Sequence, residues 1–304
     1  MRLITRSDFD GLGCAALLKE VEMIDDIKFV HPKDVQDGKV EVNSNDILTN
    51  IPYVKGCGLW FDHHSSEEER KAYGEFEGAS VPDAPSAARV IYDYYGGDEK
   101  FTNNHLRNLI SAVDKADSAD FTVEELLNPE GWVLLSFIMD PRTGLGRYKD
   151  YRISNYDLMM DMIDYCRTQT VEEILNIADV WERVKRYFDQ DKLFREMITN
   201  NTVVKDNVIV VDLRNTEEIY TGNRFVLYSL YPEQNISVQV IWGLNKQNVV
   251  MTCGHSIVTK TSNVNVGSLM LKYGGGGHKK VGTCQVPAKD ADRILEEIVE
   301  AMNK

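Results

Sequence analysis

The sequence of 304 residues lacks long apolar runs and paired cysteines, and its 34 basic residues are fewer than its 48 acidic ones. No segment approaches the roughly 18 uninterrupted apolar residues of a membrane span, so we expect no membrane association. The five cysteines are scattered without a C-x-x-C pair, which argues against disulfides or structural zinc and for a reducing, cytoplasmic setting. Because the first expected strand begins at residue 1, we expect no signal peptide.

Acidic residues outnumber basic ones, and the formal net charge is −14. This charge disfavours an extended surface that follows the phosphates of a long nucleic acid. A processive nuclease would also need basic grooves with stacking aromatic residues, and the chain has no such run. An acidic protein can still bind a small anion where metal ions and a few basic residues make a pocket positive. A small phosphate ester is therefore the expected partner.

Short apolar segments alternate with helical patterns in the first part of the chain. This alternation predicts an α/β fold with a parallel sheet covered on both faces. Strands are expected at 1–5, 27–31, 46–51 and 59–62, and helices at 12–21, 85–95, 105–113 and 132–139.

A charged stretch with helical period, 170–200, predicts one long amphipathic helix that links two domains. We place the boundary near Asn200, with a first domain over 1–200 and a smaller α/β domain over 201–304.

Polar residues follow two of the expected strands. The strand at 59–62 ends in Asp62, His63 and His64, and residues 65–69 (SSEEE) could open a helix. The strand at 1–5 leads to Asp8 and Asp10. Carboxylates and imidazoles at neighbouring strand ends predict a magnesium or manganese site. The alternative for the two aspartates is helix capping, for which one would suffice.

Two glycine-containing stretches are candidate phosphate sites. Arg142 and Arg147 flank a Gly-x-Gly segment, for which a solvated turn is the alternative. Four glycines precede His278 and Lys279, and their bare N–H groups could form an anion-binding nest or a flexible turn. No GKS or GKT ending is present, so this is not a Walker A loop.

Together, the Asp-x-Asp-Gly at 8–11, the Asp-His-His at 62–64, Asp117 and the GGGGH at 274–278 resemble the DHH-family phosphoesterases with a DHH-associated C-terminal domain. The resemblance covers essentially the whole chain and is closest to the exopolyphosphatase-related branch. It implies a parallel-sheet domain with a manganese or magnesium site, and a smaller domain that closes over the substrate.

The resemblance also implies roles for individual residues. The metal set is Asp8, Asp10, His63, Asp117 and Asn50. Asp62 would support the metal site or ligate the metal, and His64 would be the histidine that faces the phosphate of the substrate. The residues expected to bind substrate are Gly275, Gly276, Gly277, His278, Lys279, Arg142 and His255.

Three positions depart from the family pattern. Ile4 and Arg6 stand where many members have a metal-binding histidine or an acid, and Asn50 stands where a bridging aspartate is expected. A neutral amide bridges two dications poorly. We therefore predict that the metal near Asp10, His63 and Asp117 binds better than its partner, where Arg6 would supply positive charge.

The resulting hypothesis is a metal-dependent phosphohydrolase that cleaves a phosphoester or phosphoanhydride bond with a metal-activated water. Polyphosphate, a nucleotide or a short oligonucleotide are the candidate substrates. The alternative is a catalytically weakened protein that binds phosphate or nucleotide on the same fold. The sequence leaves the oligomeric state open, a homodimer included.

Overall fold

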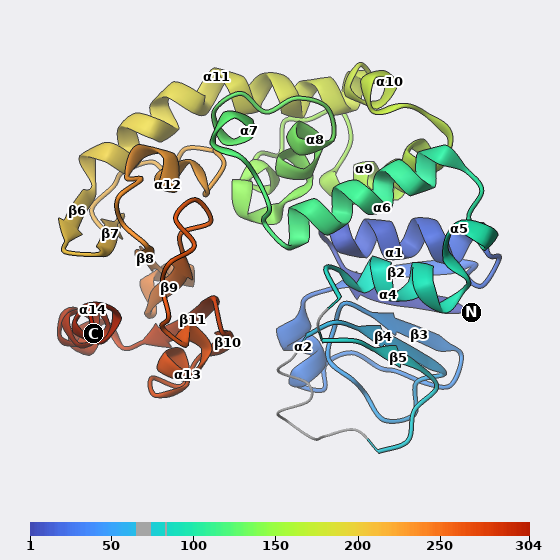
Figure 1. Ribbon diagram of the computed structural model, residues 1–304, viewed down its shortest axis with the longest axis horizontal. Coiled ribbons are helices and arrows are strands. Elements are labelled where there is room, and N and C mark those ends of the chain that lie inside the picture. The colour runs from blue at the N-terminus through green and yellow to red at the C-terminus, as the bar shows by residue number, and fades with distance from the viewer. Residues whose placement is uncertain (65–73, 83) are drawn as a thin grey trace. The chain divides into compact units, whose positions relative to one another are not determined.

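The computed structural model describes residues 1–64, 74–82 and 84–304 (Figure 1). It divides into two compact units, Met1–Asp120 with Pro129–Tyr187, and Phe121–Asn128 with Phe188–Lys304. The division falls inside helix α11 (Ala178–Asn200). The helix start expected at residues 65–69 lies outside the described residues, and the functional domain boundary near Asn200 stays a prediction.

The first unit is built on a five-stranded parallel sheet in the order β2-β1-β3-β4-β5. The expected parallel α/β architecture is therefore confirmed. The strands are β1 (Arg2–Arg6), β2 (Asp26–Val30), β3 (Asp46–Thr49), β4 (Leu59–Asp62) and β5 (Gly78–Ser80).

Both faces of this sheet are apolar, because alternate residues of its short buried strands point to opposite sides. Ile4, Leu48 and Trp60 form one cluster with Val35 of the short helix α2 (Pro32–Gln36). Phe61, the next residue along β4, packs its ring against the tyrosines at the end of α4, with centroids 5.0 and 6.3 Å away.

Among the helices of the first unit, α1 contacts α4, α6 and α9 (Figure 1). Besides α2, they are α1 (Phe9–Glu20), α4 (Ala87–Tyr94), α5 (Gly97–Lys100), α6 (Asn104–Asp117), α8 (Gly131–Met139), α9 (Asn155–Thr168) and α10 (Val171–Leu175), with the short 3-10 turns η1 (Pro141–Thr143) and η2 (Leu145–Arg147).

Two helix predictions were wrong in extent. Helix α6 continues beyond Val113, so that Asp114 and Asp117 lie within it rather than after it. The single helix expected over 170–200 is two helices, α10 and α11. Thr170 starts α10 with a capping box, and α10 ends before Asn176, a residue type that competes for backbone hydrogen bonds.

The second unit contains a six-stranded sheet in the order β10-β11-β9-β8-β7-β6, in which only β7 and β8 run parallel. The strands are β6 (Thr202–Lys205), β7 (Val208–Asp212), β8 (Ile236–Trp242), β9 (Val249–His255), β10 (Gly276–His278) and β11 (Val281–Val286). The helices are α7 (Val123–Leu127), α12 (Val226–Leu230), α13 (Val266–Leu271) and α14 (Ala291–Met302), with the turns η3 (Leu244–Lys246) and η4 (Ala288–Asp290).

One core holds this unit together. Val238 and Val240 of β8, Met251 of β9 and Ile298 of α14 are all fully buried within it. Because β8 and β9 alternate buried and half-buried positions, one face of the sheet carries α13 and α14.

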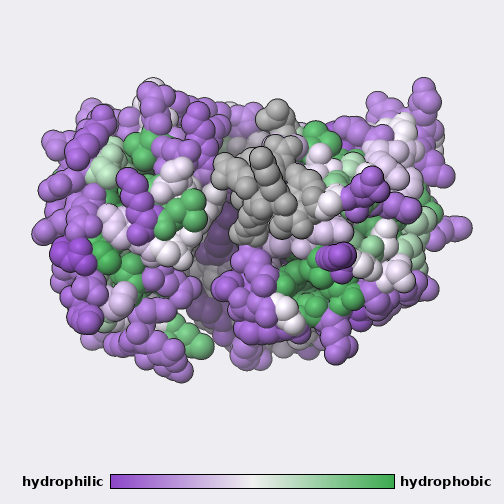
Figure 2. Space-filling view, turned by 90° about the horizontal axis from the view of Figure 1, so that it is seen from below, coloured by the Kyte–Doolittle hydropathy of each residue, from purple (hydrophilic) through white to green (hydrophobic). Residues whose placement is uncertain are grey.

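Much of the visible surface is hydrophilic (Figure 2). In Figure 2, hydrophilic side chains cover most of the visible face, and hydrophobic ones lie among them in small groups. Within the described part of the chain, no helix combines the length and apolar character that crossing a membrane requires.

Candidate metal centre

Polar residues meet at the carboxyl ends of three adjacent strands. Asp8 follows β1, Asn50 follows β3 and His63 follows β4, and these strands are neighbours in the order β1-β3-β4. The strand order reverses at β1 and β3, which is where open α/β sheets place their ligands. Asp10, in the first turn of α1, and Asp117, the last residue of α6, complete the group.

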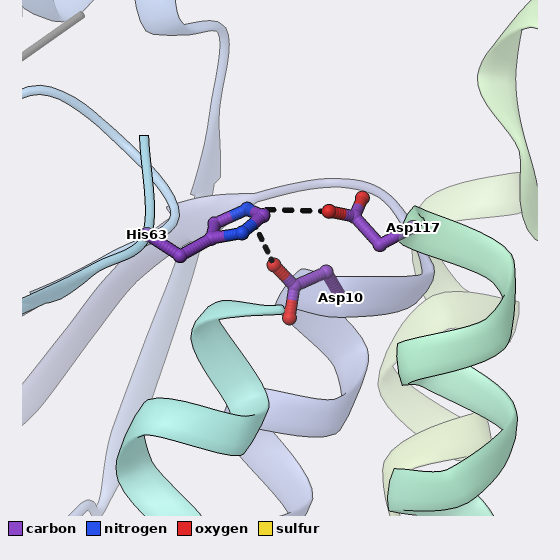
Figure 3. A group of neighbouring side chains, drawn as sticks. All are labelled: Asp10, His63 and Asp117. Carbon is purple, nitrogen blue, oxygen red and sulfur yellow. Dashed lines mark ion pairs between the residues drawn. The ribbon is translucent and has the colours of Figure 1, made fainter. Parts of the chain in front are cut away.

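Three of these side chains converge (Figure 3). The Nε2 atom of His63 lies 3.2 Å from Oδ2 of Asp117 and 3.8 Å from Oδ2 of Asp10. Asp10 is fully buried, the His63 side chain is 12% exposed and that of Asp117 is 32% exposed. Among the described residues, these three offer one ligand atom each within 4.8 Å of one another. A nitrogen with two carboxylate oxygens suits manganese or magnesium.

The ring of His63 is oriented by the backbone. Its Nδ1 lies 3.1 Å from the carbonyl oxygen of Ala84, so Nδ1–H donates there and Nε2 is left to face the two carboxylates. Nε2 is buried and makes no hydrogen bond to a described residue. A histidine held through one nitrogen, with the other aimed at two carboxylates, is the arrangement of a metal ligand.

Asp10 is held by the first turn of α4. Its two carboxylate oxygens accept hydrogen bonds from the backbone N–H groups of Ala87 and Ala88, at 3.0 and 2.8 Å. These N–H groups lack intrahelical partners because they begin a helix, which Ser86 caps. Burial, together with the charges of Asp117 and Asp8, raises the pKa of Asp10 to about 7 against the opposing effect of His63. A bound cation would remove this cost of burying the carboxylate.

Asp8 has a different environment. Its Oδ1 accepts from the backbone N–H of Gly11 and from Nδ2 of Asn50, both at 3.0 Å, and its Oδ2 lies 2.9 Å from Nε of Arg6. It is also the N-cap of α1. The helix-capping alternative therefore describes Asp8, whereas Asp10 lies in the convergent group.

Asp62 and His64 form a pair beside this group. Nδ1 of His64 lies 2.8 Å from Oδ1 of the buried Asp62. Burial lowers the pKa of His64, but the charge and hydrogen bond of Asp62, with the charges of Asp117 and Asp10, outweigh burial and raise the pKa to about 9. The paired carboxylate of Asp62 thus favours the cationic form of His64, which suits contact with a phosphate oxygen.

Arg142 is also near the acidic group. Its Nε contacts Asp140 at 2.8 Å, in the turn η1. Burial lowers the pKa of Arg142, but the charges of Asp140, Asp8 and Asp117 outweigh burial and raise it. The structure thus gives Arg142 a position in the electrostatic field of the candidate centre, where its charge favours an anionic ligand.

The remaining candidates belong to the second unit. Gly276 to His278 form strand β10, and a Cβ at Gly275 or Gly277 would overlap the backbone of β11. The close approach that the glycines permit is thus made to a neighbouring strand. Lys279 follows in the hairpin turn, and Nε2 of His255 lies 2.8 Å from the carbonyl oxygen of Val264. Substrate binding by these residues stays a prediction.

Two supports of the centre were not foreseen from the sequence. The Ala84 carbonyl that orients His63 is a backbone group, so no residue type announces it. Arg89 pairs with Asp114 at 2.6 Å and so connects α4 to α6. Helix α4 supplies the N–H groups that hold Asp10, and α6 contains Asp117. An acid and a base on separate helices give no local pattern.

Several solved structures are similar to this chain. A solved pGpG-specific phosphodiesterase, PggH of Vibrio cholerae, is 50% identical, with 99% of this chain and 98% of that chain covered and a TM-score of 0.82. An exopolyphosphatase-related protein of Bacteroides fragilis is 11% identical, with coverage of 98% and 91% and a TM-score of 0.50. RecJ of Thermus thermophilus in complex with Mn²⁺ is 12% identical, with coverage of 99% and 52% and a TM-score of 0.55.

No protein-family model matches the chain, and no curated protein matches it. The 50% identity to the phosphodiesterase over nearly the whole chain nevertheless defines the class, which is that of phosphoester hydrolases, and the other two structures share the fold. The chain belongs to the DHH-family phosphoesterases, as the sequence motifs predicted. It is a phosphoesterase, and Asp10, His63 and Asp117 form a group that could hold a metal ion.

Proposed function

We propose that this enzyme hydrolyses a short linear dinucleotide, with pGpG as the first candidate, to nucleoside monophosphates. The observation that carries the proposal is the 50% identity to the pGpG-specific phosphodiesterase over 99% of this chain and 98% of that one. A small dianionic or trianionic substrate also agrees with the net charge of −14, which disfavours long nucleic acids.

We further propose that Asp10, His63 and Asp117 hold the resident cation, with manganese preferred over magnesium because one ligand is an imidazole. When bound, this cation lowers the pKa of water and polarises the phosphoryl group. The protein then orients the substrate: cationic His64, held by Asp62, and Arg142 favour the phosphoryl oxygens on which charge develops. In the reaction, the oxygen of water bonds to phosphorus while the bond between phosphorus and the 3′ oxygen breaks. The 3′ oxygen then takes up a proton.

The second unit is proposed to hold the rest of the substrate through the hairpin glycines with His278, Lys279 and His255. Variants of Lys279 would then raise KM with little change in kcat. A homodimer and a cytoplasmic location also remain proposals.

The test is product formation from pGpG, pApA, cyclic di-GMP, pyrophosphate and polyphosphate, each with Mn²⁺, with Mg²⁺ and after metal removal. The expected result is guanosine monophosphate from pGpG, dependent on added metal. Faster turnover of pyrophosphate or polyphosphate than of pGpG would contradict the substrate class and would favour an exopolyphosphatase-like activity.

A further inference from the structure

The carboxylate of Asp8 is already used within the protein. Three groups direct positive charge at it: the backbone N–H of Gly11, Nδ2 of Asn50 and the guanidinium of Arg6, at 2.9 to 3.0 Å. Asp8 is buried, so these contacts replace solvent rather than compete with it. A cation on Asp8 would compete with the guanidinium for Oδ2 and would place a second positive charge beside Arg6, and Ile4 supplies no ligand to offset this repulsion.

The neighbouring positions Ile4 and Asn50 offer no second carboxylate. Ile4 is fully buried in the apolar cluster of the sheet, with its side chain against Leu48 and Trp60. Asn50 has a φ of 55°, a left-handed conformation that asparagine tolerates, and it points its amide N–H₂ at Asp8. Around Asp8 the structure therefore presents donors, whereas around His63 it presents acceptors.

Arg6 has capacity left for a ligand. Its side chain is 33% exposed, and its nitrogens make the ion pair with Asp8 and no hydrogen bond to another described residue. Guanidinium has five N–H groups in a planar fork that matches phosphate oxygens. Because Arg6 ends β1, its charge lies at the same sheet edge as Asp10 and His63.

We propose that this phosphoesterase works with one resident divalent cation, on Asp10, His63 and Asp117, and that Arg6 supplies the second positive charge to the substrate's phosphoryl group. In this arrangement Asp8 is a positioning residue that fixes Arg6 rather than a metal ligand. The role of Arg6 toward the substrate rests on the proposed function. The number of bound cations does not depend on which substrate is hydrolysed.

The first test is the stoichiometry of Mn²⁺ binding to the metal-free protein, measured by calorimetry and by metal analysis after dialysis. The expected value is one equivalent per chain. Asp8→Asn should keep Mn²⁺ affinity within about tenfold, whereas Asp117→Asn should lose about 100-fold or more. Two equivalents of similar affinity, or an equal loss in both variants, would overturn the proposal.

The second test separates Arg6 from a general effect of removing an arginine. Arg2 is a matched control, because it lies at the opposite end of β1 and pairs with Asp46 at 2.8 Å. Arg6→Gln should lower kcat/KM for pGpG by about 100-fold, the usual loss for one group that stabilises transition-state charge, with Mn²⁺ binding unchanged. Arg2→Gln should leave both unchanged, and equal effects of the two variants on kcat/KM would overturn the role of Arg6.

A third measurement keeps the inference independent of the substrate. If the wild-type enzyme does not hydrolyse pGpG, the proposed substrate fails. Binding of inorganic phosphate to the manganese-loaded protein still tests Arg6, because Arg6→Gln should weaken it about tenfold or more and Arg2→Gln should not. Equal phosphate affinity in wild type and Arg6→Gln would contradict the proposal.

Discussion

Asp117→Asn is the variant for which the structure gives the sharpest expectation. Asp117 lies at the end of α6 with its side chain 32% exposed, and its carboxylate faces Nε2 of His63. The amide has the same shape and keeps one acceptor oxygen. The fold of the metal-free protein should therefore be preserved, while the cation loses one of its two carboxylate ligands.

The magnitude follows from ligand number and linkage. Loss of groups that only orient ligands costs about 10- to 100-fold in metal affinity, so loss of a ligand carboxylate should cost about 100-fold or more. At a Mn²⁺ concentration 100 times the wild-type Kd, metal stabilises the wild type by about 2.7 kcal/mol. The variant, then at its own Kd, should gain only about 0.4 kcal/mol.

The assay is chemical denaturation of both proteins with and without Mn²⁺, beside a calorimetric titration. Asp161→Asn is the control, because this exposed carboxylate on α9 removes the same charge away from the centre. Metal stabilisation of Asp117→Asn equal to that of the wild type would refute the assignment of Asp117. A large loss of stability in the metal-free variant would contradict the argument that its fold is preserved.

Three further predictions concern pH, turnover and the glycine hairpin. The pKa of Asp10 is about 7 in the folded protein against an ordinary 3.8, so the contribution of Asp10 to metal-free stability should fall as pH rises between those values. Mn²⁺ should therefore stabilise the protein more at pH 8 than at pH 5.5. Equal stabilisation at both pH values would contradict this expectation. Alanine at Asp62 or His63 should abolish turnover with the far-ultraviolet circular dichroism unchanged, and full activity would exclude the centre. Gly277→Ala should lower the free energy of unfolding by about 2 kcal/mol, because a Cβ would overlap β11 and Gly277 has a φ of 154°. A Cβ at Gly276 would meet open space, so Gly276→Ala should change the free energy of unfolding little. Equal effects of the two variants would contradict this explanation.

Much of the first unit could be predicted because its signals are local. The strand 59–62 is the same in expectation and structure, and the helix expected at 85–95 is α4, Ala87–Tyr94. The convergence of Asp10 and His63 was predictable because both follow strands of one parallel sheet, whose carboxyl ends share an edge, although β3 lies between β1 and β4. Such features depend only on residue order and on the geometry of parallel sheets.

Other features depend on contacts between distant residues and gave no local pattern. Asp8 and Asp10 look alike in the sequence, yet Asp8 meets Arg6 and Asn50 while Asp10 meets the start of α4. The glycines of the GGGGH segment were expected to form an anion-binding nest or a turn. Only the hairpin register shows that their backbone packs closely against β11. Spacing alone could not identify either partner.

The most direct test of the metal centre is an anomalous difference map at the manganese edge, from crystals grown with Mn²⁺. The account predicts one strong peak within bonding distance of Asp10, His63 and Asp117, and none beside Asp8. A map with no peak at these three residues, or with its strongest peak on Asp8, would contradict it.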